Sequence, residues 1–145
     1  MEIRRTLSRI ERSGLSHFLE RLTFDSYQVH NNWQATVKNS GMEFVDNPSG
    51  CFFIGGNTGS GKTHICTAIC GELIKQGYEV RYYLWRDLLH RLEANRFEED
   101  RYSNLMDEIR NTDVVYIDDF LKTKGDKSKN ASALEYAFEI INQRY

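Results

Sequence analysis

The hydrophobic positions of this chain follow a helical period in its first third. Apolar side chains recur every three or four residues over 3–22, which predicts helical structure that the Ser13-Gly14 pair interrupts. The same spacing predicts a second helix over 32–45, after an extended or turn segment at 23–27. The apolar side of that second helix is expected to carry Trp33, Val37, Met42 and Phe44 or Val45.

From residue 46 onward, short apolar runs alternate with helical stretches. A turn at 46–50, which contains the only proline, leads into a predicted buried strand over 51–55. Further strands are predicted over 79–85 and 113–117. The helices expected around them are 62–76 (closed by Gly77), 86–95, 102–110 and 131–145, with Leu134, Phe138 and Ile141 on the apolar stripe of the last one and a polar, basic loop at 122–130.

Strands that alternate with helices predict the α/β fold class, with a parallel sheet between two layers of helices and therefore a three-layered domain. A chain of 145 residues is one domain by length and can bury a substantial core. We expect an N-terminal helical segment, 1–22, followed by the α/β domain, 23–145.

Charge and composition exclude some classes of partner and compartment. The net charge of −2 gives no overall field toward nucleic acid or membrane. The basic N-terminus, through Arg4, Arg5, Arg9 and Arg12, fits either phosphate contact or a solvated helix face. No apolar run has the length of a membrane span, and the N-terminus lacks the apolar core of a signal peptide. We therefore expect a cytoplasmic protein without a membrane partner.

The cysteines raise the question of a metal site. His64, Cys66 and Cys70 lie on one predicted helix, and the two cysteines share a face. A structural zinc needs four ligands, and no second cluster of thiolates or imidazoles supplies the rest. The pattern favours small buried side chains that face the sheet, and three cysteines fit a reducing compartment.

The octapeptide at 56–63, Gly-Asn-Thr-Gly-Ser-Gly-Lys-Thr, fits the phosphate-loop pattern G-x-x-x-x-G-K-[ST] in full. A predicted strand precedes it and a predicted helix follows it, as a working phosphate loop requires. Glycines let the backbone N–H groups point at phosphate oxygens, and the helix adds the positive end of its dipole. Lys62 is expected to reach the β- and γ-phosphates as a catalytic residue, and Thr63 to ligate Mg²⁺. The expected cofactor-binding residues are Gly56, Asn57, Thr58, Gly59, Ser60, Gly61, Lys62, Thr63 and His64.

A second acidic motif follows the strand over 113–117. Val114 to Ile117 is an apolar run that ends in Asp118 and Asp119, at the carboxyl end where α/β sheets place ligands. Asp118 is expected to hold Mg²⁺ through water, and Asp119 to orient or deprotonate the attacking water. The alternative is an acidic turn that closes a strand. Asp119 is one methylene shorter than the glutamate common at this position in ATPases, which predicts a slow, switch-like ATPase.

The sequence indicates the base of the nucleotide less directly than it indicates the phosphates. Thr123-Lys124-Gly125-Asp126 resembles the guanine-reading [NT]-K-x-D signature, but it follows the acidic strand too closely. No D-x-x-G follows Asp118 or Asp119. We interpret 123–126 as part of a basic loop and expect ATP.

From residue 13 onward the sequence resembles the AAA+ module of bacterial and phage helicase loaders, the DnaC/DnaI-like and IstB-like ATP-binding proteins of the AAA+/ASCE type of P-loop NTPase. The most specific matching pieces are Tyr-Leu-Trp-Arg-Asp-Leu-Leu at 83–89 and the Asn-x-Arg-Tyr ending at 142–145. Further matches are 12–14, 23–27, 53–64, 116–119 and 139–141. The resemblance implies ATP and Mg²⁺ as cofactors, a replicative hexameric helicase and single-stranded DNA as partners, and a homo-oligomer formed through the AAA+ module. In the IstB branch it implies help to a transposase.

The resemblance also shows what this sequence lacks. The family continues with a strand that carries the sensor-1 residue, an arginine finger and a helical lid. We expect the chain to be a fragment with weak turnover; the alternatives are that a partner supplies the strand or that the sheet closes differently. Phe24 and Tyr27 lie where the family's linker approaches the adenine, and plain packing is the equal alternative. The aromatic residues of 81–86 fit either a base-stacking platform or, as we prefer, the core. A small-molecule kinase and a non-catalytic nucleotide-binding module remain alternative functions.

Overall fold

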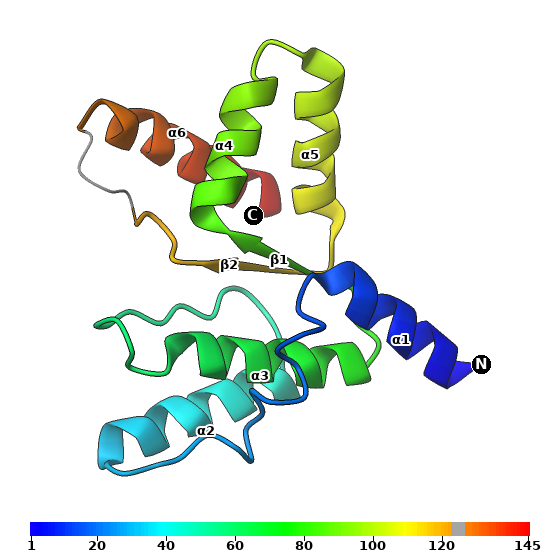
Figure 1. Ribbon diagram of the computed structural model, residues 1–145, viewed down its shortest axis with the longest axis vertical. Helices are drawn as coiled ribbons and strands as arrows, with labels where there is room; N and C mark the ends of the chain where they lie inside the picture. Colours follow the sequence, from blue (N-terminus) through cyan, green and yellow to red (C-terminus); the bar gives the residue numbers. More distant parts are fainter. Residues whose placement is uncertain (123–126) are drawn as a thin grey trace. The chain divides into compact units, whose positions relative to one another are not determined.

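The computed structural model describes residues 1–122 and 127–145; for residues 127–129 it describes the backbone alone (Figure 1). The chain divides into two compact units, Met1–Val80 and Arg81–Tyr145, and each is described by itself. The guanine-type signature considered at 123–126 lies outside the described residues. No helix in the described part of the chain is long and apolar enough to cross a membrane.

The first unit consists of three helices, in which α1 (Glu2–Ser13) and α2 (Asn32–Asp46) both pack against α3 (Lys62–Lys75). The prediction that helical structure returns after the Ser13-Gly14 break is wrong, because 15–22 forms turns. Gly14 caps α1 with a left-handed φ of 79°, which a residue without a Cβ adopts at little cost. The helix ends there, and Leu15, which follows it, is fully buried instead of continuing the helix.

Helix α3 is the centre of this unit. Most of its residues after the first turn are buried. Of the two cysteines predicted to be buried on this helix, Cys70 is buried and Cys66 is only partly buried. Helix α2 packs closely against the ring of Phe24 at Gly41, where a Cβ would lie 3.1 Å from that ring. The predicted apolar side of α2 is only partly right, because Val45 is buried whereas Trp33 and Met42 remain half exposed.

The predicted buried strand over 51–55 is wrong. These residues form no strand, and Phe53 is 77% exposed. A strand exists only where a neighbour supplies the other half of the hydrogen-bond ladder, and the described sheet consists of β1 and β2 alone. The α/β class is therefore confirmed with a small parallel sheet, while the full three-layered arrangement is only partly present.

In the second unit, β1 (Val80–Leu84) and β2 (Val114–Asp118) lie side by side. Helices α4 (Trp85–Asn95), α5 (Glu99–Asn111) and α6 (Lys127–Arg144) pack against one another beside this sheet (Figure 1). The core interpretation of the aromatic residues is confirmed for Tyr83 and Trp85, which are buried among leucines of α4 and α5, whereas Tyr82 is only partly buried. Trp85 begins α4 instead of ending the strand.

Helix α6 corrects two expectations. It begins at Lys127, so the predicted basic loop at 122–130 is shorter than expected. The predicted apolar stripe is the exposed one, and the buried face carries two alanines and an isoleucine, because small side chains let α6 approach its neighbours closely. The exposed residues are Leu134, Phe138 and Ile141, and the buried ones are Ala133, Ala137 and Ile140.

The end of α6 is fixed by Arg144, the arginine of the Asn-x-Arg-Tyr ending. Its Nη1 donates to the carbonyl oxygens of Ile109 (2.7 Å) and Thr112 (2.8 Å), and its Nη2 donates to that of Asp113 (3.1 Å). The last carbonyls of a helix lack partners within it, and a guanidinium fork satisfies several at once. This motif therefore has a structural role, since it ties α6 to the end of α5 and the approach to β2.

Candidate nucleotide-binding site

The phosphate loop at 56–63 is exposed along most of its length and runs directly into α3. Gly61 is the N-cap of the helix and has a left-handed φ of 87°, so the chain turns sharply from loop to helix. Gly61 has no side chain to cap the helix, so the first N–H groups of α3 keep their capacity to bind an anion.

Lys62 is held inside the loop. Its Nζ donates to the carbonyl oxygens of Gly56 (2.8 Å) and Asn57 (2.6 Å) and lies 3.3 Å from Ser60 Oγ. An ammonium has three donors, and here the loop's own oxygens receive them. The positive charge is therefore placed at the centre of the curled backbone, where a bound phosphate would replace these acceptors.

The residues present fit a polyphosphate. A Cβ at position 61 would lie 3.0 Å from Cε2 of Tyr27, so the close packing of this ring against the loop leaves no room for a side chain. Thr63 is exposed in the first turn of α3, and its hydroxyl is the kind of oxygen that Mg²⁺ accepts. No group of three His, Cys, Asp or Glu residues within 1–122 and 127–145 could hold a metal ion by itself. A single hydroxyl such as that of Thr63 suits Mg²⁺, which keeps most of its water and binds phosphate oxygens as well.

A groove of about 380 Å³ adjoins the loop within the first unit. Tyr27 forms part of its wall, where it packs against Gly61, so the packing role considered for this residue is present. Asn31 caps α2, because its side chain accepts a hydrogen bond from the backbone N–H of Gln34. The side-chain Oε1 of Gln34 in turn accepts from the backbone N–H of His30 at 2.6 Å. The lining comprises Ser26, Tyr27, Gln28, His30, Trp33 and Gln34 together with Gly59, Ser60, Gly61 and His64.

His64 is placed differently from the other predicted cofactor-binding residues. Its Nε2 lies 2.7 Å from the carbonyl oxygen of Thr23 and 3.1 Å from Ser26 Oγ. A carbonyl oxygen only accepts, so Nε2 carries the hydrogen. The ring thus joins the turn at 23–27 to the first turn of α3.

The two carboxylates lie in the second unit, where β2 ends. Asp118 Oδ1 accepts from the backbone N–H of Asp119 at 2.9 Å, and its Oδ2 accepts from the hydroxyl of Tyr82 at 3.4 Å. Burial, followed by the negative charge of Asp118, raises the pKa of Tyr82 to about 12. Tyr82 therefore remains a hydrogen-bond donor to Asp118 throughout the physiological pH range.

Asp119 has a left-handed backbone with φ of 52°, and its Oδ1 lies 3.5 Å from Nζ of Lys122. Asp and Asn enter this region more readily than longer side chains do. The backbone therefore supplies a reason for aspartate at this position that does not depend on catalysis.

Sequence reasoning missed Tyr82 as the partner of Asp118 and missed Trp33 and Gln28 as groove residues. The partner could have been found from the register of the two strands, because Tyr82 and Asp118 both lie near the carboxyl ends of parallel neighbours. Trp33 and Gln28 belong to no motif. The structure brings the phosphate loop together with the groove in the first unit, and Asp118 and Asp119 together with Tyr82 in the second.

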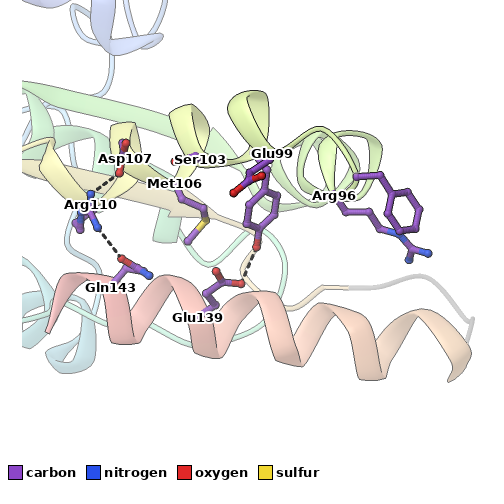
Figure 2. Close-up of a pocket in the computed structure, with 10 residues that line it drawn as sticks. Arg96, Glu99, Ser103, Met106, Asp107, Arg110, Glu139 and Gln143 are labelled. Atoms are coloured by element: carbon purple, nitrogen blue, oxygen red, sulfur yellow. Dashed lines mark hydrogen bonds and ion pairs between the residues drawn. The ribbon is translucent and has the colours of Figure 1, made fainter.

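The second unit has another groove, of about 310 Å³, along α5 and α6 (Figure 2). The hydroxyl of Tyr102 donates to Glu139 at 2.6 Å, and Arg110 Nη1 donates to Gln143 Oε1 at 3.3 Å. Both contacts cross from α5 to α6, so they tie the two helices together along the groove.

Comparison with known proteins gives the family. Residues 3–145 match the family model described as IstB-like ATP binding protein. The chain belongs to this family. The match spans the phosphate loop, both acidic residues and the Asn-x-Arg-Tyr ending, so ATP binding is supported at the level of the family.

Several curated proteins are similar to this IstB-like chain. The replicative helicase loader DnaC of Escherichia coli K12 is 26% identical over 123 residues, which are 82% of this chain and 49% of that protein. The uncharacterized protein YdaV of the same strain is 26% identical over 113 residues, 76% of this chain and 46% of YdaV. The uncharacterized protein YqaM of Bacillus subtilis 168 is 33% identical over 92 residues, 62% of this chain and 28% of YqaM. The chain thus spans at most about half the length of these relatives.

Proposed function

We propose that this IstB-like chain binds ATP and hydrolyses it slowly, and that ATP controls the assembly of a replicative hexameric helicase on single-stranded DNA. The observation that carries the proposal is the phosphate loop closed around Lys62 at the N-terminus of α3. The likeness to DnaC, whose name is that of a replicative helicase loader, supports the choice of partner.

In this proposal each residue of the loop has a defined task. Lys62 exchanges the loop carbonyls for the β- and γ-phosphates, and the first N–H groups of α3 bind phosphate oxygens. Thr63 and Asp118 are the residues that would hold Mg²⁺, Asp118 through water. When bound, Mg²⁺ neutralises the charge that develops on the phosphate oxygens during hydrolysis.

Asp119 is the proposed residue that orients the attacking water. Its short side chain and left-handed backbone hold the carboxylate close to the main chain. A displacement of about one bond length from the productive position can cost ~100-fold in rate. We therefore propose slow turnover, which suits a switch that must persist in its ATP-bound state.

The same proposal includes binding to single-stranded DNA, a homo-oligomer formed through this module, and a cytoplasmic location.

A transposition helper ATPase is the second candidate. It is favoured by the family model, which matches 3–145 and takes its description from IstB. The same ATP site serves both candidates, so the difference lies in the partner alone. A small-molecule kinase and a non-catalytic module have no observation of their own in their favour.

The partner is tested by capture with the purified chain as bait. The helicase and a transposase from the same genome are offered separately, each with MgATP or without nucleotide. We expect MgATP-dependent retention of the helicase, and its loss in Lys62→Ala. Retention of the transposase instead of the helicase would select the second candidate. Equal retention of the helicase with MgATP and without nucleotide would contradict control by ATP.

A further inference from the structure

The turn at 23–27 is a compact unit before it meets the phosphate loop. The N–H of Thr23 donates to Ser26 Oγ at 3.0 Å, and the N–H of Ser26 donates to Thr23 Oγ1 at 3.1 Å. Ser26 Oγ in turn donates to the carbonyl oxygen of Arg21 at 2.7 Å. These reciprocal bonds fix the turn internally, as Ser and Thr side chains do in such turns. The turn is therefore held together by its own side chains.

His64 fastens this piece to α3. Its Nε2 reaches both the carbonyl oxygen of Thr23, at 2.7 Å, and Ser26 Oγ, at 3.1 Å. The ring of Tyr27 meets the His64 ring edge-on, with centroids 5.2 Å apart and an interplanar angle of 85°. His64 follows Lys62 and Thr63 in the chain, so it links the turn to the helical turn that bears the phosphate-binding residues.

The turn also forms one wall of the groove beside the loop. Tyr27 is only 6% exposed, and its ring lies against Gly61. Its hydroxyl is buried and has no hydrogen-bond partner among the described residues. Trp33, 49% exposed, lines the same groove and offers it an accessible aromatic side chain. The wall thus offers an aromatic surface and polar groups, which suit a nucleoside, whereas the loop offers the groups that suit phosphates.

We infer that His64 is a positioning residue that sets the affinity of this site for the nucleoside part of ATP and not for its phosphates. The inference rests on the proposed nucleotide function. Without the Nε2 bonds, the turn loses its hydrogen-bonded attachment to α3 and keeps the packing of Tyr27 against Gly61, so the groove wall is held less firmly beside the loop. Lys62 keeps its own contacts, because its partners Gly56, Asn57 and Ser60 all belong to the loop.

The test compares MgATP with inorganic magnesium tripolyphosphate, which presents the phosphates without the nucleoside. Calorimetric dissociation constants are measured for wild type, His64→Ala and His64→Gln. We expect His64→Ala to weaken MgATP binding roughly tenfold, as for the loss of one or two hydrogen bonds, and to change tripolyphosphate binding less than about twofold. His64→Gln places an N–H donor near the position of Nε2, so it should restore most of the affinity for MgATP.

Controls separate this role from a general loss of structure. His17→Ala removes an exposed histidine of the same unit and should leave both constants unchanged. Ser26→Ala removes one of the two partners of Nε2 together with the bonds that Ser26 Oγ makes inside the turn, so it should weaken MgATP binding and leave tripolyphosphate binding unchanged. Equal weakening for both ligands in His64→Ala, or no weakening for either, would overturn the inference. A wild-type chain that binds neither ligand would instead refute the proposed nucleotide function, and the inference with it.

Discussion

Three tyrosines of the second unit each donate a hydrogen bond to a carboxylate. Tyr82 donates to Asp118, Tyr83 to Glu108 and Tyr102 to Glu139. Burial is the largest cause that raises the pKa of each phenol, and the neighbouring carboxylate raises it further. A phenol can donate only while it is protonated, so these contacts depend on pH.

We expect the second unit to lose stability in alkali. The pKa of Tyr82 is raised from 10.0 to about 12, and the pKa values of Tyr83 and Tyr102 are raised as well. The folded state therefore binds these protons more tightly than the unfolded state does. Their contribution is complete below about pH 10 and is lost as the pH rises from 10 toward 12.

The measurement is the urea unfolding midpoint at pH 8 and at pH 10.8. Tyr102→Phe should be less stable than wild type at pH 8. Its unfolding midpoint should decrease less between the two pH values, because it has one fewer phenol whose pKa is raised on folding. Phe138→Ala, at an exposed position of α6 that has no titrating group, should follow the wild-type pH dependence. An identical decrease in all three proteins would contradict the account.

At the scale of elements, local signals in the sequence were sufficient for most boundaries. Helices α3, α4 and α5 and strands β1 and β2 each lie within a few residues of their predicted ranges. Periodicity, turn residues and the phosphate-loop motif are all encoded nearby in the chain. The division between 1–22 and 23–145, and the roles of the site residues, stay predictions.

The features that could not be predicted depend on partners. Residues 51–55 have the composition of a strand, but pairing requires a neighbour that composition does not reveal. Helix α6 carries two plausible faces, and its alanines pack more closely than the larger side chains at Leu134 and Phe138. Asp118 was correctly expected at the end of a strand, whereas its bond to Tyr82 depends on the pairing of β1 with β2.

The burial of α6 can be tested with two adjacent isoleucines. Ile140 is 2% exposed and Ile141 is 47% exposed. Truncating a fully buried isoleucine typically costs about 2–5 kcal/mol, from lost transfer energy and the remaining cavity. We expect Ile140→Ala to lower the free energy of unfolding by that amount, and Ile141→Ala to lower it by less than about 1 kcal/mol. If chemical denaturation showed a larger loss of unfolding free energy for Ile141→Ala than for Ile140→Ala, the apolar stripe predicted from the sequence would be the buried one.

At the scale of the whole molecule, the residues proposed to share one MgATP are divided between the two units. Lys62 and Thr63 belong to the first unit, and Asp118 and Asp119 to the second. The chain also spans only about half the length of the DnaC proteins it resembles. ATP binding is the part of the account that the phosphate loop carries by itself, whereas the proposed turnover also involves Asp118 and Asp119 of the second unit.

The most direct test of the central claim is the affinity of the chain for MgATP, measured by calorimetry in wild type, Lys62→Ala and Lys75→Ala. Lys75 lies in the last turn of the same helix, where it pairs with Glu72 at 2.8 Å, so it controls for the loss of a lysine from α3. We expect wild type and Lys75→Ala to bind MgATP alike, and Lys62→Ala to show no detectable binding, because its ammonium has no substitute in the loop. Equal affinity in Lys62→Ala and wild type, or no binding of MgATP by wild type, would contradict the account.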